Sequence, residues 1–373
     1  MVRPDSSNGD RMGKESLVSC IVTFWNTEEF LGEAIESVLA QTHENLELLL
    51  VDDGSTDGST KIARRYAERF SERVRYLEHE GHENRGAAAS RNLGISEAGG
   101  EFIALLDSDD VWLGHKLEEQ VALLDAHPEA GMVYGQSQYW HSWTTDPEDA
   151  HRDHVPKLGV PTDTLFEPAM LSKLVHPLGP ATAPCPSDLL LRRSAVERVG
   201  GFEVAFRGMH QLYDDQTFLA KMYLHEPVYV ADECWDRYRQ HPDQLVSVVR
   251  DAGQQHTVRL AFLRWLAEYF YAQGVDNPEL WKLLQEKLLQ TSNRIQTRQA
   301  RENERRIRSK DTRIADLESS LKEQRRRTRR LRKRNRGLMQ QVKGLDQELG
   351  DIKGSVLWQL SRVLGRIRAS LSR

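Results

Sequence analysis

This 373-residue chain contains few cysteines. It also has no long apolar run, and its first residues are not apolar. The three cysteines, Cys20, Cys185 and Cys234, are widely spaced and match no zinc-binding pattern, which indicates a reduced, cytoplasmic compartment. No apolar run reaches the roughly 18 residues that a membrane-spanning helix requires. Residues 1–15 are polar and have no hydrophobic signal-peptide core, so we expect a disordered leader there.

The formal net charge of −5 conceals two parts of opposite sign. Residues 1–293 hold 27 Lys and Arg against 47 Asp and Glu, whereas residues 294–336 hold 18 basic and 6 acidic residues. Residues 337–373 add 6 basic and 3 acidic residues. An acidic body followed by a basic tail predicts a two-part protein.

From residue 17 onward, apolar patterns alternate between those of strands and those of helices. Expected strands are 17–25, 46–51, 74–77 and 101–106, and expected helices are 29–41, 61–70 and 86–98. This order predicts an α/β fold with a mostly parallel sheet and helices on both faces. Ligands of such sheets bind beyond the carboxyl ends of the strands. Polar residues follow three of these ends, at 23–26, 52–55 and 107–110, and should share one crevice.

The second half of the body is less regular. Expected strands are 131–140, 189–191 and 228–231, and expected helices are 194–199, 214–224, 256–271 and 279–290. Eight prolines fall within 141–187, and a long irregular stretch beside a rigid scaffold is typical of a region that sets substrate specificity. We expect a principal domain over 16–250 and a helical extension over 251–295.

The strand at 101–106 ends in Asp107-Ser108-Asp109-Asp110. Three acids within four positions at the end of a buried strand repel one another and lose solvation. A divalent cation resolves this conflict, and carboxylate oxygens suit Mg²⁺ or Mn²⁺, which also take phosphates as ligands. The alternative is a solvated turn before the next helix.

From residue 307 the pattern changes to heptads, which predict a coiled coil over 300–353 and hence a homo-oligomer of two or three strands. Asn335 occupies an a position, where one polar residue can fix register and strand number. A single solvated basic helix is the alternative, because the seam is weakest in the Arg-rich stretch 325–336. The positions with 3-4 spacing, ten of them apolar, are Ile314, Leu317, Leu321, Gln324, Thr328, Leu331, Asn335, Leu338, Val342, Leu345, Leu349, Ile352 and Val356.

Residues 354–373 predict a basic amphipathic helix. One face carries Val356, Leu357, Leu360, Val363, Leu364, Ile367 and Leu371, with Trp358 at its margin and arginines interspersed. This composition suits the interface of an anionic membrane. The alternative is a helix that docks on the catalytic body or on a protein partner.

Five short motifs occur in the order and spacing found in family 2 glycosyltransferases. They are VTFWN at 22–26, SVLAQT at 37–42, VDDGSTD at 51–57, NRG with RN within 84–92, and LDSDD at 106–110. The chain resembles this family from about residue 17 to about residue 241. The resemblance implies a GT-A fold, a nucleotide-sugar-binding α/β domain, and it leaves the coiled coil and the tail outside.

The resemblance implies that Asp107, Asp109 and Asp110 hold a divalent metal, Mn²⁺ or Mg²⁺, which bridges the donor phosphates. Whether Asp109 or Asp110 binds the metal directly stays open, since the motif has one acid more than it needs. His241, in the segment Tyr238-Arg239-Gln240-His241, resembles a family histidine that can approach the metal or the diphosphate.

The resemblance also implies the residues that bind the nucleotide sugar. Asp53 resembles the aspartate that accepts a hydrogen bond from the nucleobase, and Trp25 offers a stacking face. The other positions are Thr23, Asn26, Asn84, Arg91, Asn92, Asp107 and Ser108. Structural roles remain open: Asp52 and Asp53 could cap a turn, Trp25 could belong to the core, and Arg91 could pair with Glu97.

An inverting sugar transfer needs a carboxylate beside the acceptor hydroxyl. The family carries it on a Glu-Asp pair at a helix start, and here Asp214 and Asp215 follow Gly200-Gly201-Phe202. Asp215 matches the base, while Asp214 replaces the usual glutamate with a shorter acid. The alternative is an N-cap.

The favoured function is metal-dependent inverting transfer of a sugar from a nucleoside-diphosphate sugar to a glycan or a lipid-linked acceptor, in surface polysaccharide synthesis at the inner face of the membrane. A second hypothesis is a scaffold that binds nucleic acid or another anionic polymer through residues 325–336. That stretch lacks aromatic residues, which argues against base recognition. A catalytically dead scaffold is a third, against which the intact acids argue.

Overall fold

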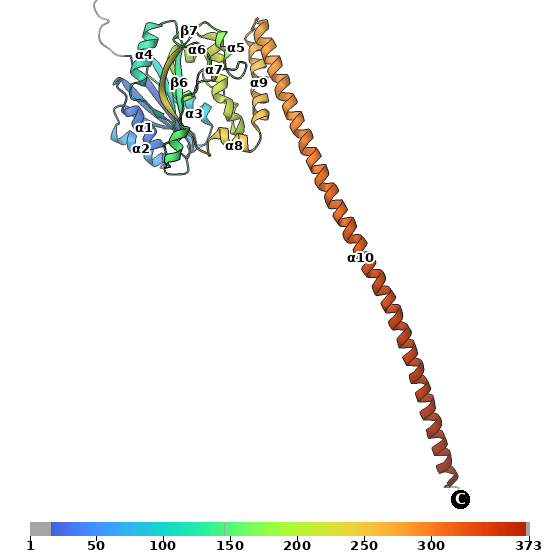
Figure 1. The fold of residues 1–373 in the computed structure, drawn as a ribbon. Helices are drawn as coiled ribbons and strands as arrows, with labels where there is room; N and C mark the ends of the chain where they lie inside the picture. The colour runs from blue at the N-terminus through green and yellow to red at the C-terminus, as the bar shows by residue number, and fades with distance from the viewer. Residues whose placement is uncertain (1–15, 145, 371–373) are drawn as a thin grey trace, which may run out of the picture. The chain divides into compact units, whose positions relative to one another are not determined.

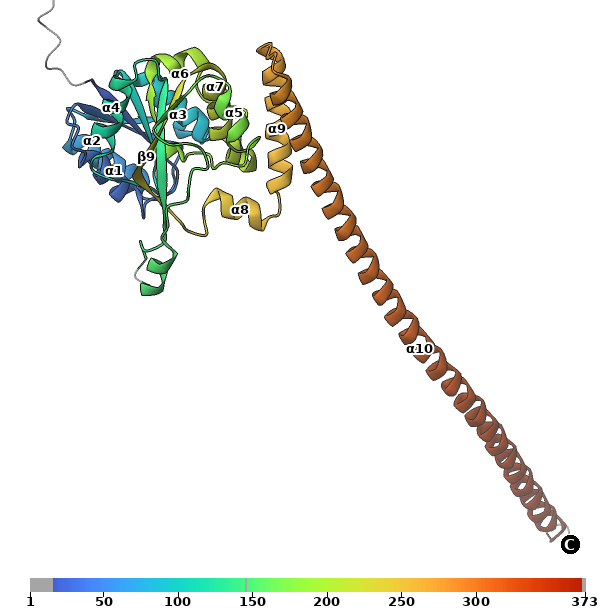
Figure 2. The ribbon, with the colours of Figure 1, turned by 45° about the horizontal axis from the view of Figure 1, so that its top comes forward.

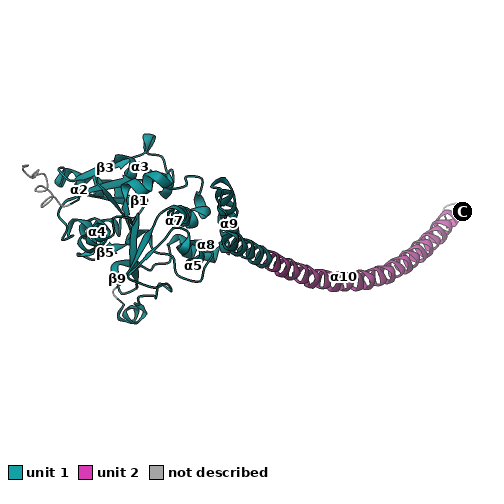
Figure 3. Cartoon of the chain, turned by 90° about the horizontal axis from the view of Figure 1, so that it is seen from above, with its two compact units in different colours: residues 1–295 teal, residues 296–373 magenta. Residues whose placement is uncertain are grey.

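The computed structural model describes residues 16–144 and 146–370. The expected leader at 1–15 lies outside the described residues. The chain divides into two compact units, residues 1–295 and residues 296–373 (Figure 3). Unit 1 holds the sheet and the helices packed on it, and the described part of unit 2 is helical.

Four parallel strands form the N-terminal part of the sheet in unit 1. They are β1 (Val18–Phe24), β2 (Leu46–Asp52), β3 (Val74–Glu78) and β4 (Phe102–Asp107), in the spatial order β3-β2-β1-β4. Thr23 of β1 pairs with Val51 on one side and with Asp107 on the other. The carboxyl ends of β1, β2 and β4 therefore lie side by side, as expected for a parallel sheet.

The sheet continues from β4 through mixed pairings in the order β8-β6-β9-β5, and β7 pairs with β9. β8 is antiparallel to β4 and to β6, whereas β6 and β9 are parallel. β9 runs to Arg239, although its apolar pattern predicted an end at residue 231. The strands are β5 (Val111–Trp112), β6 (Met132–Trp140), β7 (Thr164–Phe166), β8 (Leu190–Arg192) and β9 (Val228–Arg239).

Helices cover both faces of the sheet (Figure 1). Val18, Cys20 and Val22 of β1 pack into the apolar core beneath α1, α2 and α4, whereas Ile21 faces the core shared with α3, α5, α6 and α7. Alternate residues of one strand thus serve both layers. The helices are α1 (Leu31–Leu39), α2 (Ser59–Arg69), α3 (Ala87–Glu97), α4 (Lys116–Ala126), α5 (Met170–Leu174), α6 (Arg193–Val199) and α7 (Asp214–His225).

Short 3₁₀ turns connect these elements: η1 (Glu80–His82), η2 (Pro147–Arg152), η3 (Pro186–Asp188) and η4 (Gly208–Tyr213). In its described part, the proline-rich region 141–187 consists of loops and of the short elements η2, β7, α5 and the start of η3. The sequence patterns did not predict α4, α5, β5 or β7.

A third apolar cluster closes unit 1. It joins α8 (Leu245–Asp251) and α9 (Gln255–Ala272) to the first turns of α10 (Pro278–Ser370). Phe262 and Phe270 of α9 are buried there with Leu280 and Leu284 of α10, and Tyr213 stacks on Phe262. Figure 2 shows α9 beside the start of α10.

The described part of unit 2 is the remainder of α10. The expected helix at 279–290, the heptad region and the described part of the basic amphipathic segment form one uninterrupted helix. Every residue from 296 to 370 is exposed. None of the helices in the described part of the chain is long and apolar enough to cross a bilayer.

Candidate active site

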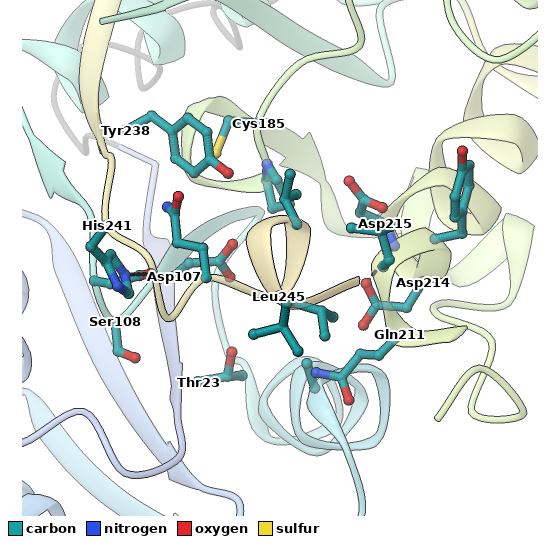
Figure 4. A pocket seen from close by; sticks show the side chains of 18 of the residues that line it. Thr23, Asp107, Ser108, Cys185, Gln211, Asp214, Asp215, Tyr238, His241 and Leu245 are labelled. Carbon is teal, nitrogen blue, oxygen red and sulfur yellow. Dashed lines mark hydrogen bonds and ion pairs between the residues drawn. The ribbon is translucent and has the colours of Figure 1, made fainter. Parts of the chain in front are cut away.

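A cavity of about 1650 Å³ opens at the carboxyl ends of β1, β2 and β4 (Figure 4). The three polar strand ends predicted to share a crevice contribute Thr23, Asp53 and Asp107 to its wall. Asp215, from the start of α7, and His241, which follows β9, line the same cavity. Polar side chains from five parts of the chain thus face one space.

Asp53 is held by the backbone of the segment before α3. Its Oδ1 accepts hydrogen bonds from the amides of Arg85, at 2.7 Å, and Gly86, at 3.0 Å, and its Oδ2 accepts from Gly86 at 2.9 Å. Burial raises the pKa of the Asp53 carboxyl, and the two amides oppose that shift. Gly54 has φ +77°, and a Cβ there would meet the amide nitrogen of Asn84 at 2.7 Å, so glycine is required for this close approach.

Asp52 is fully buried and caps the turn after β2. Its Oδ1 accepts from the Ser55 amide at 2.8 Å, and its Oδ2 accepts from the Thr60 and Tyr76 hydroxyls at 2.5 and 3.1 Å. Asp52 therefore has the structural role foreseen as an alternative, while its neighbour Asp53 lines the cavity.

The remaining positions assigned to nucleotide-sugar binding lie around this wall. Thr23, Trp25, Asn26, Asn84, Arg91, Asp107 and Ser108 all line the cavity. Trp25 is 54% exposed and thus does not belong to the core. Asn26 Oδ1 accepts from the Thr56 amide at 2.7 Å, and Ser108 Oγ accepts from the Thr27 hydroxyl at 3.0 Å. Asn92 does not line the cavity; its amide pairs with the Phe202 backbone at 2.8 and 2.9 Å.

The acids after β4 point in different directions. Asp107 and Asp109 line the cavity, whereas Asp110 is fully buried behind it. Asp110 Oδ2 accepts from the Ser187 hydroxyl at 2.6 Å, and its Oδ1 accepts from the Arg239 amide at 3.0 Å. Burial, reinforced by the neighbouring acids, raises the pKa of Asp110 well above its usual range.

Asp109 meets His241 at the cavity wall, with Asp109 Oδ2 3.1 Å from His241 Nε2. Arg239 fixes this pair from behind, because its Nε donates to the Asp109 carbonyl at 2.6 Å and its guanidinium binds Glu33 at 2.6 Å. The His241 ring also packs against Phe30, with 5.1 Å between ring centroids.

A second group of ligand-type atoms lies deeper. One atom each from Asp107, Asp110 and Cys185 fall within 4.8 Å of one another. Burial raises the pKa of the Cys185 thiol, however, and Cys185 Sγ lies 3.5 Å from Asp110 Oδ2, as in a hydrogen bond from a protonated thiol. Asp107, Asp109 and His241 offer hard oxygen and nitrogen donors that face the cavity, but among the described residues they do not form such a group within 4.8 Å.

Arg91 of α3 joins the two sides of the site. Its buried guanidinium donates to Asp107 Oδ1 at 2.7 Å and to Asp214 Oδ2 at 3.1 Å. The expected alternative partner, Glu97, binds Arg75 instead, at 2.5 Å. Arg91 thus offsets carboxylate charge at β4 and at α7 together.

Asp214 and Asp215 begin α7, and of the two only Asp214 is bound to Arg91. The Asp215 amide donates to Asp214 Oδ1 at 2.6 Å, while Asp215 accepts from the Gln216 amide at 2.6 Å. Burial and the negative charge of Asp214 raise the pKa of Asp215 to about 7, against an opposing effect of Arg91. A carboxylate with this pKa can accept a proton near neutral pH.

The sequence patterns missed several residues of the site. Behind the cavity wall, Arg239 and Ser187 position the acids of the Asp-Ser-Asp-Asp segment, and η4 and α8 supply Met209, Gln211 and Leu245 to the wall itself. In the view of Figure 4, Leu245 lies between the side with His241 and the side with Asp215. Arg239 alone had a signal, its place two residues before His241.

Comparison with known proteins finds glycosyltransferases. A family model described as "Glycosyl transferase family 2" matches residues 19–200. Glycosyltransferase GlyG of Streptococcus pneumoniae is 40% identical over 125 residues, 33% of this chain and 40% of that protein. The Escherichia coli protein named UDP-Glc:alpha-D-GlcNAc-diphosphoundecaprenol beta-1,3-glucosyltransferase WfgD is 40% identical over 108 residues, 29% of this chain and 41% of that protein.

A solved structure, TarS 1-349 of S. aureus in complex with UDP-GlcNAc, has a TM-score of 0.54 and 20% identity, with 73% of this chain and 71% of that chain covered. The likeness confirms the GT-A type of α/β fold. The chain spans between about a fifth and about two fifths of the length of the curated relatives it matches.

Proposed function

Because residues 19–200 belong to glycosyl transferase family 2, we propose that the protein transfers a sugar from a nucleoside-diphosphate sugar to a hydroxyl acceptor. One observation carries this proposal: Asp53, the Asp109–His241 pair and Asp215 all line a single cavity. The reaction needs three functions in one place: a group that accepts a hydrogen bond from the nucleobase, an edge that binds the diphosphate, and a carboxylate that takes the proton of the acceptor hydroxyl.

A divalent cation, Mn²⁺ or Mg²⁺, would bind at the diphosphate-binding edge. Asp109 and His241 would hold it, since both line the cavity and Asp109 Oδ2 lies 3.1 Å from His241 Nε2, and Asp107 would join them by turning its carboxylate toward the pair. Asp110 would not, because both its oxygens already accept hydrogen bonds from the protein. The cation would supply positive charge beside the diphosphate that leaves.

The transfer would invert the configuration of the sugar, with Asp215 as the base. Asp215 faces the cavity from α7, and its carboxylate accepts only from Gln216 among the contacts described. It would take the proton of the acceptor hydroxyl while that oxygen attacks the sugar carbon on the side opposite the diphosphate. Asp214 would position it through the Asp215 amide.

The acceptor would be a glycan or a lipid-linked saccharide of a surface polysaccharide. WfgD is named for a diphosphoundecaprenol acceptor and for UDP-Glc, and the TarS structure holds UDP-GlcNAc, so a uridine donor is the first candidate. Leu158, Pro180 and Pro184 of the proline-rich region line the cavity, where an acceptor would enter.

The tail, residues 296–370, would hold the enzyme as a homo-oligomer, and its basic amphipathic end would contact the inner face of the membrane. Leu357, Leu360 and Leu364 are each at least half exposed, which supports a role as a contact surface. The protein would then be a peripheral protein on the cytoplasmic side of the membrane.

A panel of UDP, GDP and TDP sugars with Mn²⁺ tests the proposal, by thermal shift for binding and by release of nucleoside diphosphate for turnover. We expect one donor class to raise the apparent Tm and to be turned over, and EDTA to abolish turnover. Asp52→Asn serves as a control for nonspecific effects, since Asp52 lies outside the cavity wall. No stabilisation by any donor, or turnover unaffected by EDTA, contradicts the proposal.

A further inference from the structure

An apolar stripe without a partner runs along the part of α10 that forms unit 2. Ile314, Leu331, Leu345 and Ile352 are between 51% and 64% exposed, and every residue from 296 to 370 is exposed in the described chain. An apolar stripe with a strict 3-4 repeat is the seam of a coiled coil rather than a face toward a globular core. A second helix is therefore its natural cover.

The helix also needs a partner for its own stability. Gly337, Gly344, Gly350, Gly354 and Gly365 lie inside it, and each costs about 1 kcal/mol relative to Ala in a helix. With Asn335 at an a position, all five fall at b, c or f, on the side away from the seam. A Cβ at any of them would meet nothing within 4 Å. None of these five glycines therefore interrupts the apolar seam, and all of them lie on the outer face of the helix.

Three polar layers decide the direction of the partner. Within 314–356, Thr328 and Asn335 occupy a positions and Gln324 is the one polar residue at d. A parallel, in-register pair sets each against its own copy, where the side chains can bond to each other. An antiparallel pair sets a against d, so at least one of Thr328 and Asn335 must face an apolar side chain and lose a hydrogen bond.

Charge points to the same arrangement. In a parallel pair each g residue faces the e residue five positions later on the partner. Within 313–356, two such pairs are attractive and one is repulsive, so the charges favour this alignment on balance. The attractive pairs are Arg313 with Glu318 and Glu348 with Lys353, and the like-charged pair is Arg327 with Arg332.

The antiparallel registers that match polar layers are worse. With Gln324 against Asn335, Arg325 lies opposite Arg332 and Arg327 opposite Arg334, and only Arg313 with Glu348 is attractive. With Gln324 against Thr328, Arg325 and Arg327 each lie opposite their own copies. Like charges across the seam repel, and each contact between two different residues occurs twice in a symmetric pair.

The seam composition sets the number of strands. β-Branched residues at a with leucine at d favour two strands over three or four. The a positions are Ile314, Leu321, Thr328, Asn335, Val342, Leu349 and Val356, and the d positions are Leu317, Gln324, Leu331, Leu338, Leu345 and Ile352.

We infer that residues 314–356 pair with a second copy of this chain as a parallel, in-register, two-stranded coiled coil. The inference rests on the proposed self-association of the tail and specifies its partner, direction and register. It does not depend on which reaction unit 1 carries out, because no residue of 296–370 lines the cavity.

Single cysteines introduced into the full chain test the direction. Leu317→Cys and Val356→Cys lie at opposite ends of the seam. In the parallel arrangement each variant alone oxidises to a disulfide-linked dimer. In an antiparallel arrangement neither does so alone, and a cross-link near the ends requires two different variants. Ser319→Cys, at an outward f position, is the matched control and stays largely uncross-linked, as does the natural chain.

A charge exchange tests the register. Arg313→Glu or Glu318→Arg alone turns two attractive contacts of the dimer into repulsive ones, which weakens association on the order of tenfold. The double exchange in one chain restores it. Residues 313 and 318 are five apart and do not face each other on one helix, so the rescue reports a contact between chains.

Sedimentation equilibrium of the full chain completes the experiment, with donor turnover measured on the same samples. A dimer mass, self-cross-linking at 317 and 356, and rescue by the double exchange support the inference. A monomer or trimer mass, or cross-linking only between different variants, overturns it. Turnover without a dimer sinks this inference alone, whereas a parallel dimer without turnover sinks the proposed reaction alone.

Discussion

At the scale of single residues, neighbouring carboxylates differ in whether they reach the cavity. Asp52 and Asp110 are fully buried, with both oxygens in hydrogen bonds inside the protein, while Asp53, Asp109 and Asp215 line the cavity. Two acids that are adjacent in the sequence thus divide into one that is buried in the protein and one that is accessible from the cavity.

Asp215→Asn should lower kcat by about 10²- to 10⁴-fold and leave the affinity for the donor unchanged, because the base is lost while the donor edge is intact. The amide also removes a buried charge beside Asp214, so the Tm should not fall. Turnover and thermal unfolding on the same preparation check both statements. Turnover within a few-fold of the natural enzyme would exclude Asp215 as the base.

The pH dependence follows from the pKa of Asp215, which burial and Asp214 raise to about 7. The base acts in its deprotonated form, so kcat/KM should fall as the pH drops through about 7 and reach a plateau above it. The folded state binds this proton more tightly than the unfolded chain, so the ionised carboxylate destabilises the protein above about pH 7. The stability gain from Asp215→Asn should therefore be largest above pH 7 and vanish near pH 4.

Asp109→Asn and Asp110→Asn should behave differently although the residues are adjacent. Asp109→Asn removes a cavity-facing ligand beside His241, and we expect the Mn²⁺ concentration for half-maximal turnover to rise roughly tenfold or more. Asp110 is buried with its pKa raised, so an amide resembles its protonated form. A metal titration should show Asp110→Asn within about threefold of the natural enzyme, and equal effects would contradict our assignment of the ligands.

The sequence predicted that three polar strand ends meet in one crevice, but not how the neighbouring acids there differ. Motif spacing placed Thr23, Asp53 and Asp107 on one wall, as observed. It left Asp109 and Asp110 indistinguishable, because the difference arises from Ser187 and Arg239, which are 77 and 129 residues away from Asp110 in the chain. Such partners are set by tertiary packing, and local patterns do not contain them.

At the scale of elements, α3 shows how a helix is fitted closely to the sheet. A Cβ at Gly94 would lie 2.5 Å from Ile21 Cγ2, an atom of a stiff β-branched side chain in β1. Arg91, three residues earlier, depends on this close approach to reach Asp107 and Asp214. The packing of α3 thus positions a buried cation at the site.

Gly94→Ala should lower the free energy of unfolding by about 1–3 kcal/mol, because the strain of an added methyl exceeds the helix propensity it gains. Gly32→Ala in α1 is the matched control, since a Cβ there meets nothing within 4 Å, and it should be neutral or stabilising by up to about 1 kcal/mol. Urea unfolding of both variants checks this. An equal response of the two would show that α3 can shift freely.

Elements with a clean apolar period were predicted within a few residues, β1 to β4 among them. β9 was not, because its second half combines buried Trp235 and Asp236 with charged residues that pair along β6. A strand whose inward-facing residues are polar lacks the alternating apolar pattern from which strands are predicted. The single helix α10 was predicted as three separate segments. Its apolar pattern changes along the chain, from a packed helix to heptads to a basic amphipathic face, while its backbone remains helical throughout.

At the scale of the whole molecule, catalysis and the tail occupy separate units of the chain. All residues that line the cavity lie between Thr23 and Gln255. Unit 1 also has its own apolar clusters, the third of which includes the first turns of α10.

A chain ending at residue 295 should therefore keep donor turnover within about threefold of the full chain. It should also sediment as a monomer, because the seam is gone. The Tm of the shortened chain controls for damage to the third cluster, which depends on Leu280 and Leu284. A tenfold loss of turnover at an unchanged Tm would show that unit 2 contributes to the site.

Arg239 ties three distant parts of the chain into one rigid assembly. It contacts the Asp109 carbonyl, the Asp110 carboxylate through its amide, and Glu33 on α1, and its guanidinium lies 4.5 Å from the centre of the Trp140 ring. His241 comes two residues later, so these contacts also fix the spacing between Asp109 Oδ2 and His241 Nε2. If the proposed cation binds between these two atoms, the fixed spacing would favour ions of matching radius over larger or smaller ones.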